Sequence, residues 1–285
     1  MKSKAKTSKV KDHLVSGEIF EVHYHEDFEY ASTEIAEGLD LSQYYPKTNY
    51  ASHLQKPKGI KGKLYVLVQS LMLRYKRSII KQHQNDIQLL DVGGGIGVFA
   101  HYLKERGDQV QLVEPSASAR KIATYKGLKT YRSLNEIPKA RAFSVISLWH
   151  VLEHVKNLEE SLQSYSKLLS SKGLIVIAVP NLNSFDAQYY GSKWAALDVP
   201  RHLWHFTENG IVRKLDEQGF SFIKSYPLWF DAFYIASLSE GYAGNKFAFF
   251  RGILIGLFSN LKAAFTKEYS SKIYLFKKKT RVLEH

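Results

Sequence analysis

The sequence predicts a doubly wound α/β fold, because strand-length apolar runs alternate with helix-length amphipathic segments over more than half of the chain. The run Ile87–Val92 ends in a glycine-rich turn, Gly93–Gly97, and a helical segment follows. The next apolar run ends on an acid, Glu114. This order of strand, glycine turn, helix, strand and acid is typical of a nucleotide-binding βαβ unit, whose ligand lies at the carboxyl ends of the strands.

The other elements follow from the same periodicities and from cap residues. Before the core, residues 19–24 alternate as a strand, residues 40–53 form an irregular aromatic stretch, and residues 60–82 have apolar residues at helical spacing. In the core we expect strands at 87–92, 109–114, 128–132, 143–149 and 173–179, and helices at 97–106, 116–126 and 157–170, the last closed by Lys172-Gly173. Thr207 and Gly219 cap a further helix, and strands follow at 220–226 and 272–276.

Composition limits the class of protein. The chain has 285 residues, enough for one large α/β domain with appendages or for two small domains. It has no cysteine, which excludes disulfides and thiolate metal sites and agrees with a cytoplasmic location. The net charge of +13 suits an acidic partner, but the lysines crowd Lys2–Lys11 and Lys277–Lys279. Because no basic–aromatic nucleic-acid module is recognisable and Met1–Lys11 lacks an apolar core, we expect neither a nucleic-acid substrate nor a signal peptide.

The position of Asp91 at the mouth of the glycine turn discriminates between cofactors. A dinucleotide places its pyrophosphate at this turn, where a carboxylate would repel it. S-adenosylmethionine carries an ammonium and a sulfonium group and no phosphate, so the acid favours this cofactor. The register Gly95-x-Gly97-x-x-Ala100 also fits the relaxed dinucleotide fingerprint, which leaves an NAD(P)-dependent oxidoreductase as the alternative. Glu114 can bind a ribose diol in either case.

Two segments carry a resemblance to a known family. Phe143–Val155, which contains Leu148-Trp149-His150-Val151-Leu152-Glu153-His154, and the segment from Leu168 to Asn181 resemble class I S-adenosylmethionine-dependent methyltransferases. The similarity is greatest to the broad group that includes the ubiquinone-pathway O-methyltransferases, and it covers roughly residues 85–225. It implies a Rossmann-like seven-stranded sheet whose last strand is antiparallel. This sequence departs from the group at Ser144, where the group usually has Asp, and shows no evident adenine-binding acid near residues 131–135.

The cofactor site is predicted from these motifs. Asp91 should face the amino-acid end of the cofactor, the glycines should let the backbone approach it, and Glu114 should hold the ribose. The backbone of Leu148 and Trp149 should line the methionine side. The full set of predicted cofactor residues is Asp91, Gly93, Gly94, Gly95, Gly97, Glu114, Pro115, Leu148 and Trp149.

The methyl acceptor is predicted to bind near a loop rich in Trp, His and Arg, residues 194–206. A hydroxyl acceptor needs a base that titrates near neutral pH, which His provides. We therefore expect His202 or His205 as the base, Arg201 orienting an acidic group or the loop itself, and His150 as a further catalytic residue. The alternative is a packed loop in which His205 stacks on Trp204.

The predicted organisation places appendages around the cofactor-binding core. The segments are a disordered basic tail at 1–12, an N-terminal appendage with a lid helix at 13–84, the core at 85–227, a helical insertion over the acceptor pocket at 228–267, the last strand at 268–282 and a tag remnant at 283–285. Aromatic residues of these appendages either cover the pocket or pack as ordinary core, which we favour for most of them: Tyr44, Tyr45, Tyr50, His53, Trp229, Phe230, Phe233, Tyr234 and Tyr242. A largely apolar cover favours O-methylation of a small hydrophobic or aromatic molecule.

The sequence His-x-x-Glu-His at residues 150–154 has two metal interpretations. An inverzincin protease motif is disfavoured, because it leaves the glycine turn unexplained. Some methyltransferases that resemble this group bind a divalent ion here through acids and a histidine. Glu153 and His154 match that pattern and His150 replaces an acid, so these three residues are candidates, although no metal is predicted outright. Alternatively, Glu153 and His154 hold the loop by hydrogen bonds.

The apolar segment Phe247–Phe265 is short and interrupted for a membrane span, which takes about 20 apolar residues. It lies on a membrane surface or roofs the acceptor pocket, and we favour the roof. Overall, the sequence predicts a cytoplasmic S-adenosylmethionine-dependent methyltransferase of a small molecule. The alternatives are the oxidoreductase and a cofactor-binding module without catalysis. No oligomeric state is predicted.

Overall fold

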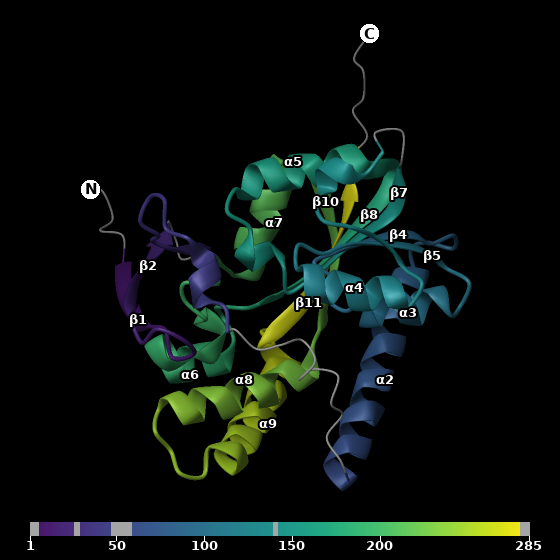
Figure 1. The fold of residues 1–285 in the computed structure, drawn as a ribbon. Helices are drawn as coiled ribbons and strands as arrows, with labels where there is room; N and C mark the ends of the chain where they lie inside the picture. Colours follow the sequence, from purple (N-terminus) through teal and green to yellow (C-terminus); the bar gives the residue numbers. More distant parts are fainter. Residues whose placement is uncertain (1–5, 26–28, 47–58, 139–141, 280–285) are drawn as a thin grey trace. The chain divides into compact units, whose positions relative to one another are not determined.

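The computed structural model describes residues 6–25, 29–46, 59–138 and 142–279, and within these ranges the chain forms an α/β architecture (Figure 1). The chain divides into two compact units. The first unit contains Met1–Pro46, His150–Glu159 and Ile177–Leu275, and the second contains Lys47–Trp149, Glu160–Val176 and Phe276–His285. Tyr50, His53 and residues 283–285, which carry sequence-based predictions, lie outside the described residues.

A seven-stranded sheet confirms the predicted doubly wound fold. Its strand order is β10-β11-β8-β7-β4-β5-β6, and β4 pairs in parallel with both β5 and β7. The order therefore reverses at β4, and this is the point at which doubly wound sheets bind ligands. The strands are β4 (Gln88–Val92), β5 (Gln109–Val113), β6 (Lys129–Tyr131), β7 (Phe143–Trp149), β8 (Leu169–Pro180), β10 (Phe220–Pro227) and β11 (Ser271–Lys278).

The helices lie close to their predicted positions. Thr207 caps α7 as expected, with its side chain accepting a hydrogen bond from the Gly210 N–H, and Gly219 follows the helix with φ of 81°. The helical insertion consists of two helices. The α-helices are α2 (Gly59–Lys81), α3 (Val98–Lys104), α4 (Ala117–Tyr125), α5 (Leu158–Leu168), α6 (Phe185–Tyr190), α7 (Glu208–Glu217), α8 (Trp229–Tyr242) and α9 (Ala248–Thr266).

The end of α5 differs from the prediction. The helix stops at Leu168, and β8 begins at Leu169 and includes Gly173, so this glycine does not close the helix. The ammonium of Lys278, on β11, instead donates hydrogen bonds to the carbonyls of Ser166, at 2.6 Å, and Leu169, at 3.3 Å. A cation from a distant strand thus satisfies carbonyls at the end of the helix, where cations are favoured by the helix dipole.

The N-terminal segment also differs from the prediction, because Lys6–Lys11 forms strand β1 and not a disordered tail. It pairs antiparallel with β2 (Ile19–His25) in a second sheet of order β1-β2-β3-β9. Strands β3 (Tyr30–Thr33) and β9 (Trp204–Phe206) are also absent from the prediction, which treated residues 194–206 as a loop. Strands β3 and β9 are stabilised by pairing with each other. The sheet to which they belong also buries an apolar side that includes Val10, Val22 and Ala31.

We expect Lys278→Met to lower the free energy of unfolding by about 1 kcal/mol, because carbonyls at the end of α5 lose a charged donor. Urea unfolding of the full chain measures the change. The matched control is Lys277→Met, because Lys277 is the exposed neighbour on the same strand. Equal losses in both variants would contradict the assigned capping role.

Candidate functional site

The glycine turn after β4 requires glycine for two physical reasons. Gly93, Gly95 and Gly97 have φ of 65°, 57° and 73°, a region that other residues rarely adopt. Space is equally restrictive, because a Cβ on Gly94 would lie 2.6 Å from an oxygen of Asp91. Gly95 differs from its neighbours, since no atom beyond its adjacent residues lies within 4 Å of where its Cβ would be. The turn is therefore packed against the sheet at Gly94 and open at Gly95, where a ligand can approach the backbone.

The carboxylate of Glu114 is fixed by backbone donors. One oxygen accepts the Gly95 N–H at 2.9 Å and the other accepts the Ser116 N–H at 2.8 Å. An ionised carboxylate can accept about four hydrogen bonds, so each oxygen keeps capacity for a diol. Arg120 donates to the carbonyls of Glu114, at 2.6 Å, and Pro115, at 3.0 Å, which holds the backbone after β5 in place.

Asp91 is a buried acid held by a hydroxyl. Its carboxylate accepts the Ser147 hydroxyl at 2.6 Å, and its exposed fraction is 1 %. Burial raises the pKa of Asp91 to about 6, against the lowering effects of Ser147 and the Lys76 ammonium. A cationic group placed beside this carboxylate would replace lost hydration, and it would return the pKa toward its usual value.

The end of β7 contributes an aromatic ring. The Lys76 ammonium lies 4.1 Å from the centre of the Trp149 ring, and Phe99 contacts the same ring edge-on at 5.1 Å. Within the described ranges, the buried Nε1 of Trp149 has no hydrogen-bond partner. Leu148 is fully buried beside Val92 in the sheet, so it contributes its backbone and not its side chain to any ligand site.

The chain returns to the first unit at His150, which has the positive φ of 55°. Its Nδ1 lies 3.3 Å from a carboxylate oxygen of Glu153, and its Nε2 lies 3.1 Å from one of Asp231. Burial opposes protonation, but the hydrogen bonds to Asp231 and Glu153 prevail and raise the pKa of His150 to about 10. At neutral pH this side chain is therefore a cation with both ring protons engaged, so it has no lone pair to act as a base.

Glu153, His154 and His202 bring their ligand atoms within 4.8 Å of one another. The Nδ1–H of His154 donates to the Arg201 carbonyl at 2.9 Å, and that of His202 donates to the Ala196 carbonyl at 2.8 Å. In the neutral rings each Nε2 then carries a lone pair. Burial lowers the pKa of His154 to about 4, and within the described ranges the buried Oε2 of Glu153 has no hydrogen-bond partner.

This cluster revises the metal candidates. Glu153 and His154 belong to it, but the third member is His202 and not His150. Histidines that bind metals usually donate their other ring N–H to a carbonyl or carboxylate, as both rings do here. The donor set of two imidazoles and one carboxylate oxygen therefore fits a divalent transition metal. Glu153 nevertheless also pairs with His150, so the hydrogen-bonding role expected for the loop is present as well.

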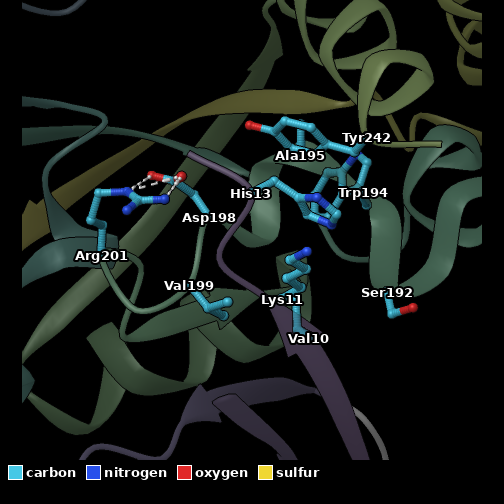
Figure 2. A pocket seen from close by; sticks show the side chains of 10 residues that line it. All are labelled: Val10, Lys11, His13, Ser192, Trp194, Ala195, Asp198, Val199, Arg201 and Tyr242. Carbon is cyan, nitrogen blue, oxygen red and sulfur yellow. Dashed lines mark hydrogen bonds and ion pairs between the residues drawn. The ribbon is translucent and has the colours of Figure 1, made fainter. Parts of the chain in front are cut away.

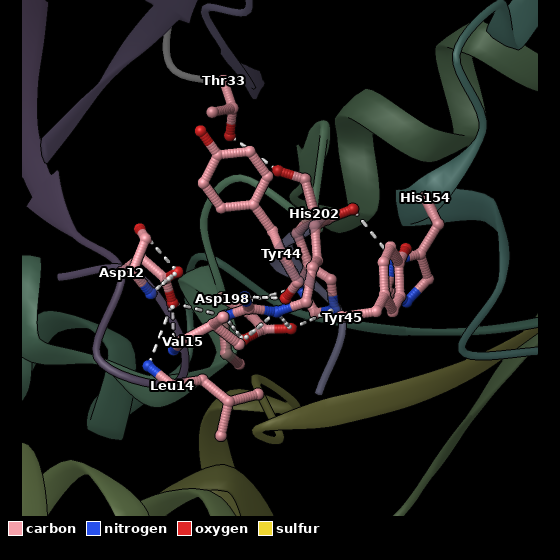
Figure 3. A network of polar contacts seen from close by, with 12 residues as sticks. Asp12, Leu14, Val15, Thr33, Tyr44, Tyr45, His154, Asp198 and His202 are labelled. Carbon is pink, nitrogen blue, oxygen red and sulfur yellow. Dashed lines mark hydrogen bonds and ion pairs between the residues drawn. The ribbon is translucent and has the colours of Figure 1, made fainter. Parts of the chain in front are cut away.

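Arg201 holds the loop and is not available to a substrate, because it is 3 % exposed and all three guanidinium nitrogens donate hydrogen bonds. Asp12, Asp198 and Tyr44, which receive these bonds, are labelled in the polar network of Figure 3. It donates to Asp12 at 2.9 Å, to Asp198 at 2.6 Å and to the Tyr44 carbonyl at 2.8 Å. Although burial favours the neutral acid, the hydrogen bonds from Arg201 and the backbone lower the pKa of Asp12 to about 2. Of the two roles predicted for Arg201, the geometry therefore favours orientation of the loop itself.

His205 is a buried structural neighbour of the cluster. The Thr33 hydroxyl donates to the His202 carbonyl at 2.6 Å, so the contact of 2.9 Å between Thr33 and Nε2 of His205 has the imidazole as donor. Burial lowers the pKa of His205 to about 3. The predicted stacking of His205 on Trp204 does not occur, because neighbours on strand β9 point to opposite sides, and the Trp204 ring contacts Tyr30.

Of the predicted aromatic cover, Tyr44 is buried and Tyr242 is half-buried, whereas Tyr45, Trp229, Phe230 and Tyr234 are exposed. Trp194 is buried and donates its Nε1–H to Asp186 at 2.8 Å, and Tyr242 stacks on His13 with ring centres 4.3 Å apart. A pocket beside Trp194, Arg201 and Tyr242 is shown in Figure 2. Its volume of about 10 Å³ suits a single water and not a methyl acceptor.

Comparison with known proteins identifies the family. The sequence model of a methyltransferase-domain family matches residues 67–225, more than half of the chain. The chain belongs to this family. The methyltransferase is 29 % identical over 124 residues to a ubiquinone biosynthesis O-methyltransferase of Rickettsia bellii. This alignment covers 40 % of this chain and 52 % of the relative. It is 30 % identical over 129 residues to the enzyme of the same name from Bradyrhizobium, covering 41 % and 51 %. The chain thus spans about half the length of the curated relatives it matches.

Solved structures share the fold. An S-adenosylmethionine-dependent methyltransferase of Thermotoga maritima has a TM-score of 0.53 at 15 % identity and covers 81 % of this chain and 97 % of its own. Magnesium protoporphyrin IX methyltransferase of Synechocystis, with bound S-adenosylmethionine, has a TM-score of 0.52 at 12 % identity and covers 86 % and 100 %. The chain therefore belongs to a methyltransferase-domain family with the matching fold, as predicted, and not to the alternative class of NAD(P)-dependent oxidoreductases.

Several residues around the site were not found from the sequence. Ser147 binds Asp91, Asp231 binds His150, and Asp12 binds Arg201. Ser147 lies inside the predicted strand at 143–149, and alternation along that strand could have indicated it. Asp12 and Asp231 are far from their partners in the sequence, and no local pattern identifies them.

We expect Asp91→Asn to weaken S-adenosylmethionine binding by at least about tenfold, because a charged acceptor for the ammonium group is lost. Isothermal titration with the cofactor and its demethylated product measures this. Asp86→Asn is the matched control, because Asp86 is an exposed acid just before the same strand. Unchanged affinity in Asp91→Asn would remove Asp91 from the cofactor site.

The raised pKa of Asp91 predicts a pH dependence of the same affinity. Below about pH 6 the free protein carries a proton on Asp91, which an ammonium group must displace. Cofactor affinity should therefore fall as the pH is lowered from 7 to 5, approaching about tenfold per pH unit below the pKa. Asp91→Asn should flatten this profile, whereas an unchanged slope would assign it to another group.

Proposed function

We propose that this methyltransferase transfers a methyl group from S-adenosylmethionine to a hydroxyl of a small hydrophobic or aromatic molecule. The observation that carries the proposal is the cluster of Glu153, His154 and His202, which joins two oriented imidazoles to a buried carboxylate. A hydroxyl must lose a proton to accept a methyl group, and this donor set suits that task. The curated relatives that match part of the chain are named O-methyltransferases, which supports the same choice.

Cofactor binding in the proposal follows from the glycine turn. Asp91 binds the ammonium group, Gly93, Gly94, Gly95 and Gly97 admit the cofactor to the backbone, and Glu114 binds the ribose diol. Pro115 and Leu148 supply fixed backbone at the strand ends. Trp149 offers its ring and an indole N–H that has no hydrogen-bond partner among the described residues. S-adenosylmethionine, when bound there, would supply the methyl group from its sulfonium to the acceptor oxygen and would be left as a neutral thioether.

For the acceptor side, Glu153, His154 and His202 would hold a divalent cation. Such an ion, when bound, lowers the pKa of a coordinated hydroxyl. The carbonyls of Arg201 and Ala196 keep the two rings in the tautomer that presents Nε2. His205 keeps its place in the proposal as a positioning residue, because it fixes Thr33, which in turn binds the His202 carbonyl. His150 would supply a fixed positive charge to the same turn.

In a second version of the proposal, His202 itself acts as the general base without a metal ion. If no cation binds, the Nε2 of His202 is the group in this cluster that would accept the acceptor's proton, and Asp198, 3.9 Å away, would stabilise the resulting imidazolium. In both versions we place the enzyme in the cytoplasm, in agreement with the absence of cysteine from the 285 residues.

We expect His202→Ala to abolish divalent-cation binding and to lower turnover of a phenolic acceptor by at least about a hundredfold. Calorimetry with Mg²⁺, Mn²⁺ and Zn²⁺, followed by a methylation assay after chelation, separates the two versions. His23→Ala is the matched control, because His23 lies in a second acid–histidine group, with Glu21 and Glu34, on the same unit.

The outcomes of these assays distinguish metal-assisted catalysis from direct base catalysis by His202, and they also test the acceptor class. Turnover that persists after chelation but is lost in His202→Ala assigns the proton to His202 itself. Near-wild-type turnover in both His202→Ala and His205→Ala would remove these histidines from the chemistry. Methylation of amines but not of phenols or other hydroxyl acceptors would contradict the proposed acceptor class.

A further inference from the structure

Helices α8 and α9 of the first unit form a hairpin (Figure 1). The side of α9 that packs in the protein consists of small residues. A Cβ added to Gly252 would lie 2.3 Å from the Cα of Ser237, and one added to Gly256 would lie 2.8 Å from the Cα of Phe233. The two backbones are therefore in direct contact. The buried residues of α9 are Gly252, Gly256, Ser259 and Ala263.

The opposite side of α9 exposes its large apolar residues. Leu254 is 65 % exposed and Phe265 is 88 % exposed. A surface helix of a soluble protein usually buries such side chains and exposes polar ones, so the pattern of α9 is inverted. A contiguous apolar face of this kind marks a binding surface. Its exposed members are Phe249, Phe250, Ile253, Leu254, Leu257, Phe258, Leu261 and Phe265.

The close packing of α9 against α8 indicates that the exposed apolar face is suited to lipid. Two glycines four residues apart that admit a neighbouring helix are typical of helices packed in lipid. Among the described residues, α9 is the helix that is long and apolar enough to cross a membrane, by length and composition only. Its partner α8 carries Asp231 and a buried Glu240, and it connects directly to the sheet at β10. A hairpin so attached suits the interface of a bilayer better than its interior.

The charged residues around the apolar face favour lipids with anionic headgroups. Between residues 246 and 267 the chain has four cations and no acid. Arg251 pairs with Glu240 at 2.9 Å, so its charge is partly compensated. A second copy of the protein would bring an equally basic face against this one, which disfavours self-association. Anionic headgroups complement it, and the cations are Lys246, Arg251, Lys262 and Lys267.

We propose that the exposed face of α9 docks this protein on the surface of an anionic lipid bilayer. The large apolar side chains enter the boundary between headgroups and acyl chains, and the flanking cations bind the headgroups. Docking does not depend on the proposed O-methylation. If both hold, the acceptor class narrows to molecules dissolved in the bilayer, and that step alone rests on the proposed function.

The test is flotation of the full chain with two kinds of vesicle, phosphatidylcholine alone and phosphatidylcholine with phosphatidylglycerol. We expect binding to the anionic vesicles that weakens as salt is added, and little binding to the neutral ones. The double variant Leu254→Asp/Leu261→Asp should bind anionic vesicles at least about tenfold more weakly. The matched control is Leu64→Asp/Leu67→Asp, because these leucines are similarly exposed on α2.

Cofactor binding, vesicle binding and oligomeric state together decide whether the face of α9 docks on a bilayer. Retained S-adenosylmethionine binding shows that the α9 variant is folded, and Lys246→Glu/Lys262→Glu should lose binding to anionic vesicles specifically. No binding of the wild type to anionic vesicles would overturn the proposal, as would equal loss in the α2 control. A wild-type dimer that the α9 variant converts to a monomer, without vesicle binding, would assign the face to self-association instead. None of these results depends on methylation, so failure here leaves the proposed reaction to its own assay.

Discussion

The buried guanidinium of Arg201 holds together parts of the first unit that are far apart in the sequence. It bonds Asp12, directly after β1, Asp198 in the loop before β9 and the carbonyl of Tyr44. A buried charge with one partner removed costs about 3–5 kcal/mol, so the arrangement is stable only when all its partners are present. The backbone of the same residue accepts the Nδ1–H of His154. The orientation of an imidazole in the candidate site therefore depends on a salt bridge made by the N-terminal strand.

The glycine turn of the second unit and the histidine cluster of the first unit rely on different physical constraints. At the glycine turn the constraint is backbone conformation and space, since Gly93 and Gly97 need positive φ and Gly94 has no room for a Cβ. At the histidine cluster the constraint is hydrogen bonding, because backbone carbonyls decide which nitrogen of His154 and His202 keeps its proton. The first kind is specified by residue type at fixed positions. The second depends on which carbonyls the fold brings near.

Electrostatics then gives similar side chains different roles. His150 lies between two carboxylates, which raise its pKa to about 10, whereas burial lowers the pKa of His205 to about 3. The sequence marks both residues as candidate catalytic residues. In the structure one is a cation and the other a neutral donor to Thr33. His150 is protonated because the carboxylates of Asp231 and Glu153 lie beside its ring. His205 is neutral because its ring is buried within the β3–β9 strand pair.

The sequence by itself determined the doubly wound core, the glycine turn and the cofactor, because each depends on local periodicity or on residue types at fixed spacing. It placed β7 at residues 143–149 and the helical insertion within a few residues of where they lie. Only the tertiary structure decided the second sheet, the capping of α5 by Lys278 and the grouping of His202, rather than His150, with Glu153 and His154 as candidate metal ligands. The composition of α9 was equally plain from the sequence, but which side it exposes was decided by its close contact with α8. In every such case the decisive partner lies far away along the chain, and a local pattern carries no information about it.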